Sequence, residues 1–294
     1  MKSIDKKISI IVVTYNSSTN IEKLIKSIDT KSNSELVELL AIIENDSPEK
    51  MITTKIIKKY KTRYLKKIKY IQSASNSGFA KSCNFGASLS NTEYILFLNP
   101  DTELTKNSLT TLLCHAIKAN SDLTGGKCLK YNGSAHNTVV RFPTLGTGLF
   151  EFSNLGKIFN IKFGNANFYY RDKDFFGADH DVCVEALGGA YLLVKRSSFI
   201  RLRGFDEDYF MYLEDVDLSV RANRLGMKSV FCPHSTIFHI GGSSTKNKYH
   251  IRHQSWYDSR RLYFHKHFGV LTNLIIQPIY IFEEYVLKIR QKFL

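Results

Sequence analysis

The sequence predicts an α/β fold in which a mostly parallel central sheet is flanked by helices, and three observations support this. Ile8–Val13 and Val37–Ile43 are apolar runs rich in β-branched residues, as expected for strands buried on both faces. The segment between them places apolar residues at helical spacing from Ile21 to Ile28. Short polar connectors join these segments, which favours strand–helix–strand units with right-handed crossovers.

The same alternation continues to about residue 100. Thr19 and Glu22 fit a capping box at the start of the first helix. The following elements are expected to be a basic helix, a short strand, a second helix and a buried strand, at Lys50–Arg63, Ile68–Gln72, Gly78–Leu89 and Tyr94–Leu98.

The second half of the chain is less regular. Residues 130–180 are rich in Gly, Asn and Phe and have little periodicity, so we expect a long loop region of the kind that often forms lids or binding loops. Val182–Val194 is apolar and is expected to form a strand that contains Gly188 and Gly189. From about Tyr249 onward the composition favours C-terminal helices.

The net charge of +14 indicates an anionic partner, which is nucleic acid, an anionic membrane surface or a phosphorylated substrate. Basic residues cluster at Lys55–Lys69 and, mixed with aromatic residues, at Lys246–His267. The first cluster fits most simply the solvated face of a helix and its following loop. The sequence contains neither the aromatic signature of an RNA-recognition motif nor paired zinc ligands, so we expect no nucleic-acid partner.

The five cysteines show no C-x-x-C spacing, which predicts reduced thiols in a cytosolic protein and argues against a zinc site. The apolar run at Ile8–Val13 is shorter than the ~7–15 residues of a signal-peptide core. No segment reaches the ~18–20 apolar residues that span a bilayer, because polar residues and Pro278 interrupt Val270–Phe282.

Polar residues follow three of the expected strands and should converge at one edge of the sheet, where ligands bind in such folds. These ends are Thr14-Tyr15-Asn16, Glu44-Asn45-Asp46-Ser47 and Asn99-Pro100-Asp101. The Asp101 carboxylate suits a divalent cation held jointly with diphosphate oxygens, although Asn-Pro-Asp is also a common turn.

Three further segments carry candidate chemistry. Glu214-Asp215-Val216-Asp217 crowds carboxylates after an aromatic string, which suits a general base at Asp215 and also suits a helix N-terminus. His239 and the nearby His234 are either metal ligands or structural histidines. Asn76–Gly86 places glycine and amides at a helix start, where backbone N–H groups can meet a phosphate or a base.

The order of these segments resembles glycosyltransferase family 2, and within it a bacterial rhamnosyltransferase-like branch. The shared motifs run from about Ile8 to Ser244. They are Val12-Val13-Thr14-Tyr15-Asn16, Asn76-x-Gly78-Phe79-Ala80, Leu98-Asn99-Pro100-Asp101, Gly204-Phe205-Asp206-Glu207 and Tyr212-Leu213-Glu214-Asp215-Val216-Asp217-Leu218. The chain departs from the family pattern at Glu44 and Asn99, where Asp is usual, and at Arg203, where Gly is usual.

The resemblance implies a GT-A fold with a catalytic domain over residues 1–245. Its nucleotide-binding half would span residues 1–102 and its acceptor-binding half residues 103–245. Residues 246–294 would form a helical tail that either associates with the membrane or mediates dimerisation.

The resemblance also implies roles for individual residues. Asp215 would be the catalytic base, and Asp101 and His239 would hold Mg²⁺ or Mn²⁺. Gly188, Gly189, Ala190 and Glu214 would contact the donor sugar and the acceptor. Nucleotide and donor binding would fall to a larger set: Thr14, Tyr15, Asn16, Glu44, Asn45, Asn76, Gly78, Phe79, Asn84, Asn99, Pro100, Asp101 and Arg221.

The activity implied is inverting, metal-dependent transfer of a sugar, with L-rhamnose from dTDP-rhamnose as the first choice. The acceptor would be a lipid-linked saccharide, used for O-antigen or capsule synthesis at the inner face of the plasma membrane. Galactofuranosyl, glucosyl or N-acetylhexosaminyl transfer from a UDP-sugar remains an alternative. A nucleotidyltransferase and a non-catalytic polyanion-binding module with the same fold are the rivals outside this activity.

Overall fold

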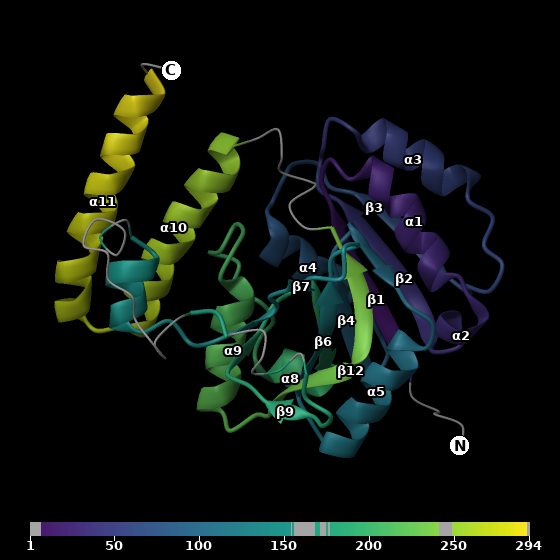
Figure 1. Ribbon diagram of the computed structural model, residues 1–294. Helices are drawn as coiled ribbons and strands as arrows, with labels where there is room; N and C mark the ends of the chain where they lie inside the picture. Colours follow the sequence, from purple (N-terminus) through teal and green to yellow (C-terminus); the bar gives the residue numbers. More distant parts are fainter. Residues whose placement is uncertain are drawn as a thin grey trace.

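The computed structural model describes residues 7–153, 155, 168–170, 175, 177–240 and 249–292. Its centre is a curled sheet with helices on both sides (Figure 1). The sheet order is β3-β2-β1-β4-β11-β6-β12-β5. These strands are β1 (Ile8–Thr14), β2 (Val37–Glu44), β3 (Ile68–Gln72), β4 (Tyr94–Leu98), β5 (Thr102–Leu104), β6 (Leu123–Leu129), β11 (Tyr191–Lys195) and β12 (Ser229–His239).

The sheet is parallel from β3 to β4, as the sequence predicts, and mixed beyond that point. β11 runs antiparallel to both β4 and β6, and β5 runs antiparallel to β12. Short strands β7 (Ala135–His136) and β9 (Val182–Cys183) pair with β6 and β12. β8 (Val139–Val140) and β10 (Ala186–Leu187) pair separately. The expectation of a mostly parallel sheet therefore describes β1 to β4.

Helices cover both faces of the sheet, so that β1 is buried on both sides. Ile10 and Val12 face a core formed with α1 and α5, whereas Ile11 and Val13 face a core formed with α4, α8 and α9. The helices are α1 (Ser18–Ile28), α2 (Lys31–Ser34), α3 (Lys50–Lys59), α4 (Phe79–Ser88), α5 (Ser108–Ala119), α8 (Arg196–Arg201), α9 (Glu214–Arg224), α10 (Tyr249–His267) and α11 (Val270–Lys292), with a π-helical turn η1 (Thr147–Glu151).

Two helix ends differ from the sequence prediction because distant side chains decide them. The start of α1 is capped by Glu49, whose carboxylate accepts from the Ser18 N–H at 3.0 Å, and Glu22 pairs with Lys26 instead of forming a capping box. Helix α3 ends at Lys59 and not at Arg63. The chain beyond it turns onto Asp29, which accepts backbone N–H groups of residues 63–65 at 2.7 Å each.

The segment 182–194 is not the single strand that its apolar composition predicts. It forms β9, β10 and β11 in succession, and the turn between β10 and β11 contains Gly188 and Gly189. The Gly188 N–H bonds to the Thr138 carbonyl at 2.7 Å, and the Gly189 N–H donates to the Asp215 carboxylate at 2.7 Å. In the 130–180 region, the described residues include β7, β8 and η1, so part of this expected loop region forms regular secondary structure.

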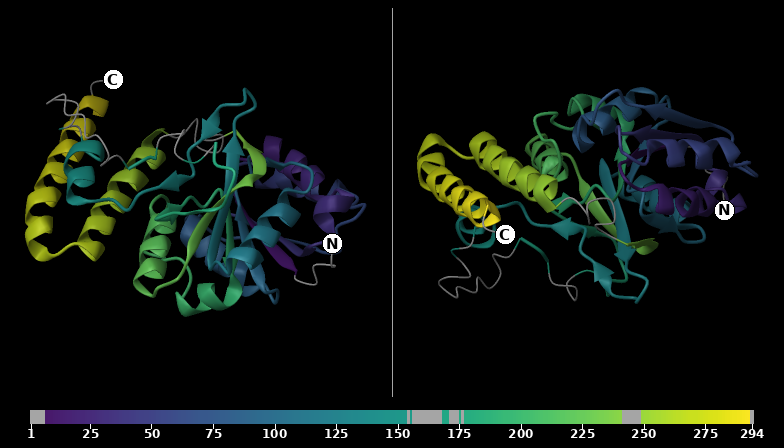
Figure 2. Two further views of the ribbon diagram at one scale, coloured as in Figure 1. Left: turned by 60° about the horizontal axis from the view of Figure 1, so that its bottom comes forward. Right: turned by 90° about the horizontal axis from the view of Figure 1, so that it is seen from above.

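The expected C-terminal helices are α10 and α11, which lie side by side next to α9 and on the opposite side of the molecule from α1 to α3 (Figures 1 and 2). Tyr263 and Phe264 of α10 pack in one buried cluster with Val216 and Val220 of α9. Helix α10 is therefore joined to α9 by a hydrophobic core. Among the described residues, no helix is long and apolar enough to cross a membrane.

Candidate active site

A cavity of about 400 Å³ opens at the carboxyl ends of β1 and β4, beside the turn before β11. Most of the residues that the sequence singled out line this cavity. They are Tyr15, Asn45, Asn76, Gly78, Phe79, Asn99, Pro100, Asp101, Gly188, Gly189, Ala190, Glu214 and Asp215. The structure thus brings together segments that are spread over two hundred residues of sequence.

Asp215 is held in the cavity wall by two backbone donors. The Gly189 N–H donates to Oδ2 at 2.7 Å, and the Val216 N–H donates to Oδ1 at 2.8 Å. Burial raises the pKa of Asp215, and these two hydrogen bonds oppose that rise because they stabilise the charged form. The carboxylate is therefore fixed in orientation and remains usable as a proton acceptor.

Glu214 lies beside Asp215 but in a different electrostatic environment. Its side chain is buried and its Oε2 has no hydrogen-bond partner among the described residues. Burial, reinforced by the charge of Asp215, raises the pKa of Glu214 well above its usual range. When two adjacent carboxyl groups share a buried site, one of them keeps its proton. We assign that proton to Glu214, which leaves Asp215 ionised.

A strained turn delivers this pair to the cavity. Tyr212 and Leu213 have φ angles of 78° and 63°, in the left-handed region that non-glycine residues rarely adopt. Leu213 is the N-cap of α9, so Glu214 and Asp215 occupy its first turn, where the helix dipole favours negative charge. Backbone strain of this kind is typical of functional sites, where the surrounding structure must maintain it.

Asp101 lies close to two histidines. The β5–β12 ladder pairs His239 with Thr102, which brings the imidazole Nε2 within 3.3 Å of Asp101 Oδ1. The His136 ring lies 4.4 Å from the His239 ring, centroid to centroid. Burial first, then the neighbouring His239 and Lys130, lower the pKa of His136 to about 4. His136 is therefore neutral at pH 7 and able to act as a ligand.

Asp101, His239 and His136 are candidate ligands of a divalent cation. Asp101 and His239 are each 5% exposed at the side chain, and His136 lines the cavity. The Nδ1 atoms of both histidines have no hydrogen-bond partner among the described residues. Carboxylate and imidazole groups are both ligands of divalent cations.

The opposite wall is held in place by Asn45. Its amide donates to Asn76 Oδ1 at 2.7 Å and to the Gly78 carbonyl at 3.0 Å, and its oxygen accepts from the Ser77 N–H at 3.0 Å. Gly78 has a φ of 83°, and a Cβ there would lie 2.4 Å from the Phe210 carbonyl oxygen. Only glycine therefore allows this wall to close against the segment that leads to Asp215.

Several residues that the sequence assigned to nucleotide binding lie behind the cavity wall. Thr14 is fully buried at the end of β1, and alternation along the strand leaves Val13 and Tyr15 on the cavity side. Asn16 follows with a φ of 52°. Glu44 is also fully buried, its carboxylate oxygens have no hydrogen-bond partner among the described residues, and burial raises its pKa.

Asn84 and Arg221 are used to hold the loop at residues 202–207. Asn84 donates to the Phe205 carbonyl at 2.8 Å and accepts from the Phe205 N–H at 2.9 Å. Arg221 pairs with Asp217 at 2.7 Å and donates to the carbonyls of Leu202 and Gly204 at 2.7 and 3.0 Å. Arg221 does not line the cavity, and these contacts direct its guanidinium to the loop.

The backbone of the same loop shows why glycine is usual at the position of Arg203. Arg203 has a φ of 59° and Gly204 one of 73°, so both occupy the left-handed region after α8. A glycine adopts this conformation without steric cost, whereas arginine adopts it only within the small allowed left-handed region.

Sequence reasoning missed part of the cavity wall. His136, Asn137 and Thr138 come from the segment that showed no periodicity, and Phe210 and Met211 belong to the aromatic string before Glu214. Nothing in the spacing around His136 indicated a site. The aromatic string did carry a signal, since it immediately precedes the carboxylate cluster.

Comparison with known proteins places this geometry in context. Residues 9–181 match the sequence profile described as Glycosyl transferase family 2. Rhamnosyltransferase WbbL of Escherichia coli K12 is 28% identical over 234 residues, which cover 76% of this chain and 80% of that protein. The N-acetylglucosaminyl-diphospho-decaprenol L-rhamnosyltransferase of Mycobacterium tuberculosis is 49% identical over 59 residues, which cover 20% and 19% of the two chains.

Solved structures with the same fold include GalNAc-T7 with UDP, GalNAc and Mn²⁺, at a TM-score of 0.60 and 14% identity over 81% of this chain. The mannosyltransferase PcManGT of Pyrobaculum calidifontis with GDP-Man and Mn²⁺ has a TM-score of 0.58 and 14% identity over 89% of this chain. The chain spans less than two thirds of both structures, 44% and 64% of their lengths. These similarities show that the fold is GT-A.

Proposed function

Since the chain belongs to glycosyl transferase family 2, we propose that it transfers a sugar with inversion from a nucleotide diphosphate donor to a saccharide hydroxyl. The observation that carries this proposal is the placement of Asp215. Two backbone N–H groups fix its carboxylate in the wall of the same cavity that contains Asp101. A general base and a diphosphate-side carboxylate in one cavity are what a single displacement requires.

In the proposed reaction, Asp215 takes the proton from the acceptor hydroxyl as that oxygen bonds to the anomeric carbon. The bond from this carbon to the diphosphate oxygen breaks on the opposite face, and the nucleotide diphosphate departs with the electron pair. Gly189 and Val216 keep the carboxylate oriented during this step, and the protonated Glu214 avoids a second negative charge beside it. The product has the inverted configuration.

Asp101, His239 and His136 would hold the divalent cation, for which we propose Mn²⁺. A bound Mn²⁺ would neutralise charge that develops on the departing diphosphate. Asn45 and Asn76 fix the wall on the other side of the cavity and would define the space available to the nucleotide.

We propose L-rhamnose from dTDP-rhamnose as the donor and a lipid-linked saccharide as the acceptor, in bacterial surface polysaccharide synthesis. Two relatives carry the name rhamnosyltransferase, and the name of the mycobacterial one includes a diphospho-decaprenol-linked sugar. The structure of GalNAc-T7 contains UDP, and a UDP-sugar donor is the alternative.

A calorimetric panel of nucleotide sugars tests this proposal. We expect one donor, dTDP-rhamnose, to bind in Mn²⁺ and to bind at least about tenfold more weakly with chelator, since the cation supplies charge at the diphosphate. Asp101→Asn should remove the effect of Mn²⁺, whereas Asp122→Asn, in the turn before β6, should not alter it.

Binding of a UDP-sugar alone would correct the donor and keep the class. Silence across the whole panel from folded wild-type protein would contradict the enzyme and favour a polyanion-binding module.

We further propose that the α11 face lies on an anionic membrane surface. Among the α11 side chains that the structure describes, seven apolar ones are exposed: Val270, Leu274, Ile275, Ile281, Phe282, Tyr285 and Ile289. At about 100° per residue they fall within an arc of about 140°. Ile276 and Tyr280, on the opposite face, are fully buried against α10 and η1. The net charge of +14 and a lipid-linked acceptor favour a membrane over a second copy of the chain.

Liposome flotation tests this face. The wild type should float with vesicles that contain anionic lipid, and Leu274→Glu with Phe282→Glu should reduce the bound fraction by about tenfold, because each charge opposes burial in the lipid interface. Met51→Glu with Ile52→Glu on α3, where both side chains are exposed, is the matched control.

Equal flotation of wild type and the α11 variant would exclude the membrane role. A wild-type dimer that the α11 variant converts to a monomer would instead assign the face to a second copy.

A further inference from the structure

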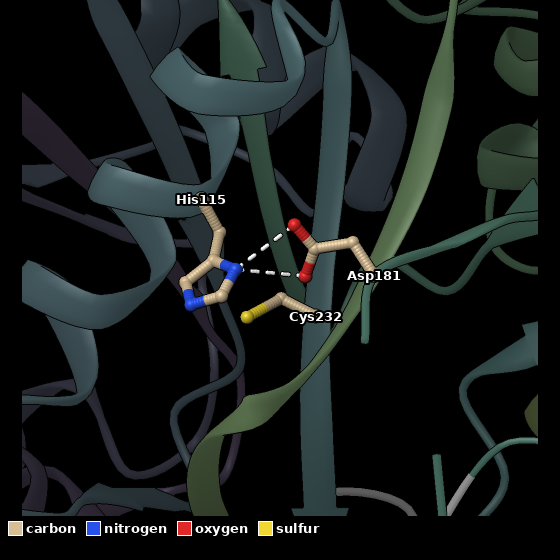
Figure 3. Close-up of side chains that lie close together, drawn as sticks. All are labelled: His115, Asp181 and Cys232. Atoms are coloured by element: carbon tan, nitrogen blue, oxygen red, sulfur yellow. Dashed lines mark hydrogen bonds and ion pairs between the residues drawn. The ribbon is translucent and has the colours of Figure 1, made fainter. Parts of the chain in front are cut away.

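A second group of metal-binding side chains lies away from the cavity. His115 of α5, Asp181 before β9 and Cys232 of β12 place one ligand atom each within 4.8 Å of one another. Figure 3 shows the imidazole and the carboxylate facing each other with the Cys232 sulfur beside them. His115 Nδ1 lies 2.8 Å from Asp181 Oδ1 and 2.9 Å from Oδ2.

This group is distinct from the Asp101 site. Cys232 pairs with Gly126 of β6, whereas His239 follows Phe238, which pairs with Leu129, so the two residues lie about 13 Å apart along the sheet. None of the three side chains lines the cavity that contains Asp215. A cation held here would therefore not touch a bound donor.

The donor atoms are those that Zn²⁺ prefers. Thiolate, imidazole and carboxylate together select zinc over Mg²⁺ or Mn²⁺, which favour oxygen ligands. Tetrahedral bonds of about 2.0–2.3 Å would separate the ligand atoms by about 3.4–3.7 Å. His115 Nδ1 and the Asp181 carboxylate, 2.8 Å apart, would have to separate by about 0.6 Å, and the Cys232 sulfur lies within 4.8 Å of both ligand atoms. Such movement is open to both, since their side chains are 25% and 21% exposed.

We propose that His115, Asp181 and Cys232 form a structural zinc site, with water as the fourth ligand. Zinc would replace the thiol proton of Cys232 and join three segments that are distant in sequence. It would link the chain before β9 to α5 and β12. The absence of C-x-x-C spacing argues against a zinc site built from cysteine pairs, whereas this donor set has one cysteine from a buried strand.

Cobalt substitution tests the site without using activity. Co²⁺ added to chelator-treated wild-type protein should produce a thiolate-to-cobalt band in the near ultraviolet, which Zn²⁺ then removes. Cys232→Ser should abolish the band, and His115→Gln should weaken zinc binding by at least about tenfold. Cys183→Ser is the matched control, because Cys183 is an exposed thiol on the adjacent β9 and its loss should leave the band unchanged.

Zinc should also raise the thermal midpoint of the wild type but not that of Cys232→Ser. Absence of the band from folded wild-type protein would overturn the proposal, as would a band that survives Cys232→Ser. Because the thiolate band reports cysteine ligation alone, cobalt at Asp101 and His239 would not imitate it.

Discussion

Asp215→Asn is expected to lower kcat by about 10²–10⁴-fold, which is the usual effect of losing a positioned general base. The amide has nearly the same shape but cannot accept the proton of the acceptor hydroxyl. It can also accept only one of the two N–H groups that now hold the carboxylate at 2.7 and 2.8 Å. Donor binding should be unchanged, since Asp215 acts on the acceptor. Steady-state kinetics together with calorimetry of the donor would measure both effects.

Asp208→Asn serves as the control for this variant. Asp208 belongs to the same acidic, aromatic region, and its side chain is 71% exposed and paired with Lys266 at 2.7 Å. Its kcat should equal that of the wild type. Undiminished turnover in Asp215→Asn would remove this residue from the role of base.

The pH profile offers a second readout of the same residue. The ionised form of Asp215 is the active one, so turnover falls as pH drops through its pKa. Because burial raises that pKa, the loss should begin at a higher pH than for an exposed aspartate.

Strands β1 and β4 could be predicted because each is buried on both faces. Ile8–Thr14 and Tyr94–Leu98 are short, apolar and bounded by polar residues, and these features are local in sequence. Helix ends were less accessible, since Glu49 caps α1 and Asp29 collects the chain after α3. Those contacts join residues that lie about thirty positions apart.

The candidate site shows the same division between local and distant information. Asp101 and Asp215 follow recognisable motifs, so the sequence could name them. The contribution of His136 depends on the β6–β7 hairpin and on the β5–β12 ladder that places His239 beside it. Arg221 had the right charge for a diphosphate, but its position on α9 directs it to Asp217 and two carbonyls. Residue type alone does not determine the direction of a side chain.

Arg260 connects the C-terminal helices to the rest of the molecule through a buried charge. Its side chain is 1% exposed and pairs with Glu283 of α11 at 3.0 Å. The guanidinium lies between the rings of Tyr257 and Tyr280, 4.1 and 3.9 Å from their centroids, and it donates to the Phe152 carbonyl after η1. Because the buried guanidinium has several partners, we expect the free energy of unfolding to be sensitive to substitution of Arg260.

Arg260→Met is therefore expected to lower the free energy of unfolding by about 3–5 kcal/mol, because it leaves the Glu283 carboxylate buried without its cation. Calorimetric or denaturant unfolding would measure the loss. Lys26→Met is the matched control, since the side chains of the Lys26–Glu22 ion pair are 63% and 47% exposed, and its removal should cost about 1 kcal/mol or less. Adding Glu283→Gln to Arg260→Met should recover much of the stability. Equal losses in Arg260→Met and Lys26→Met would show that the buried charge does not hold α11 in place.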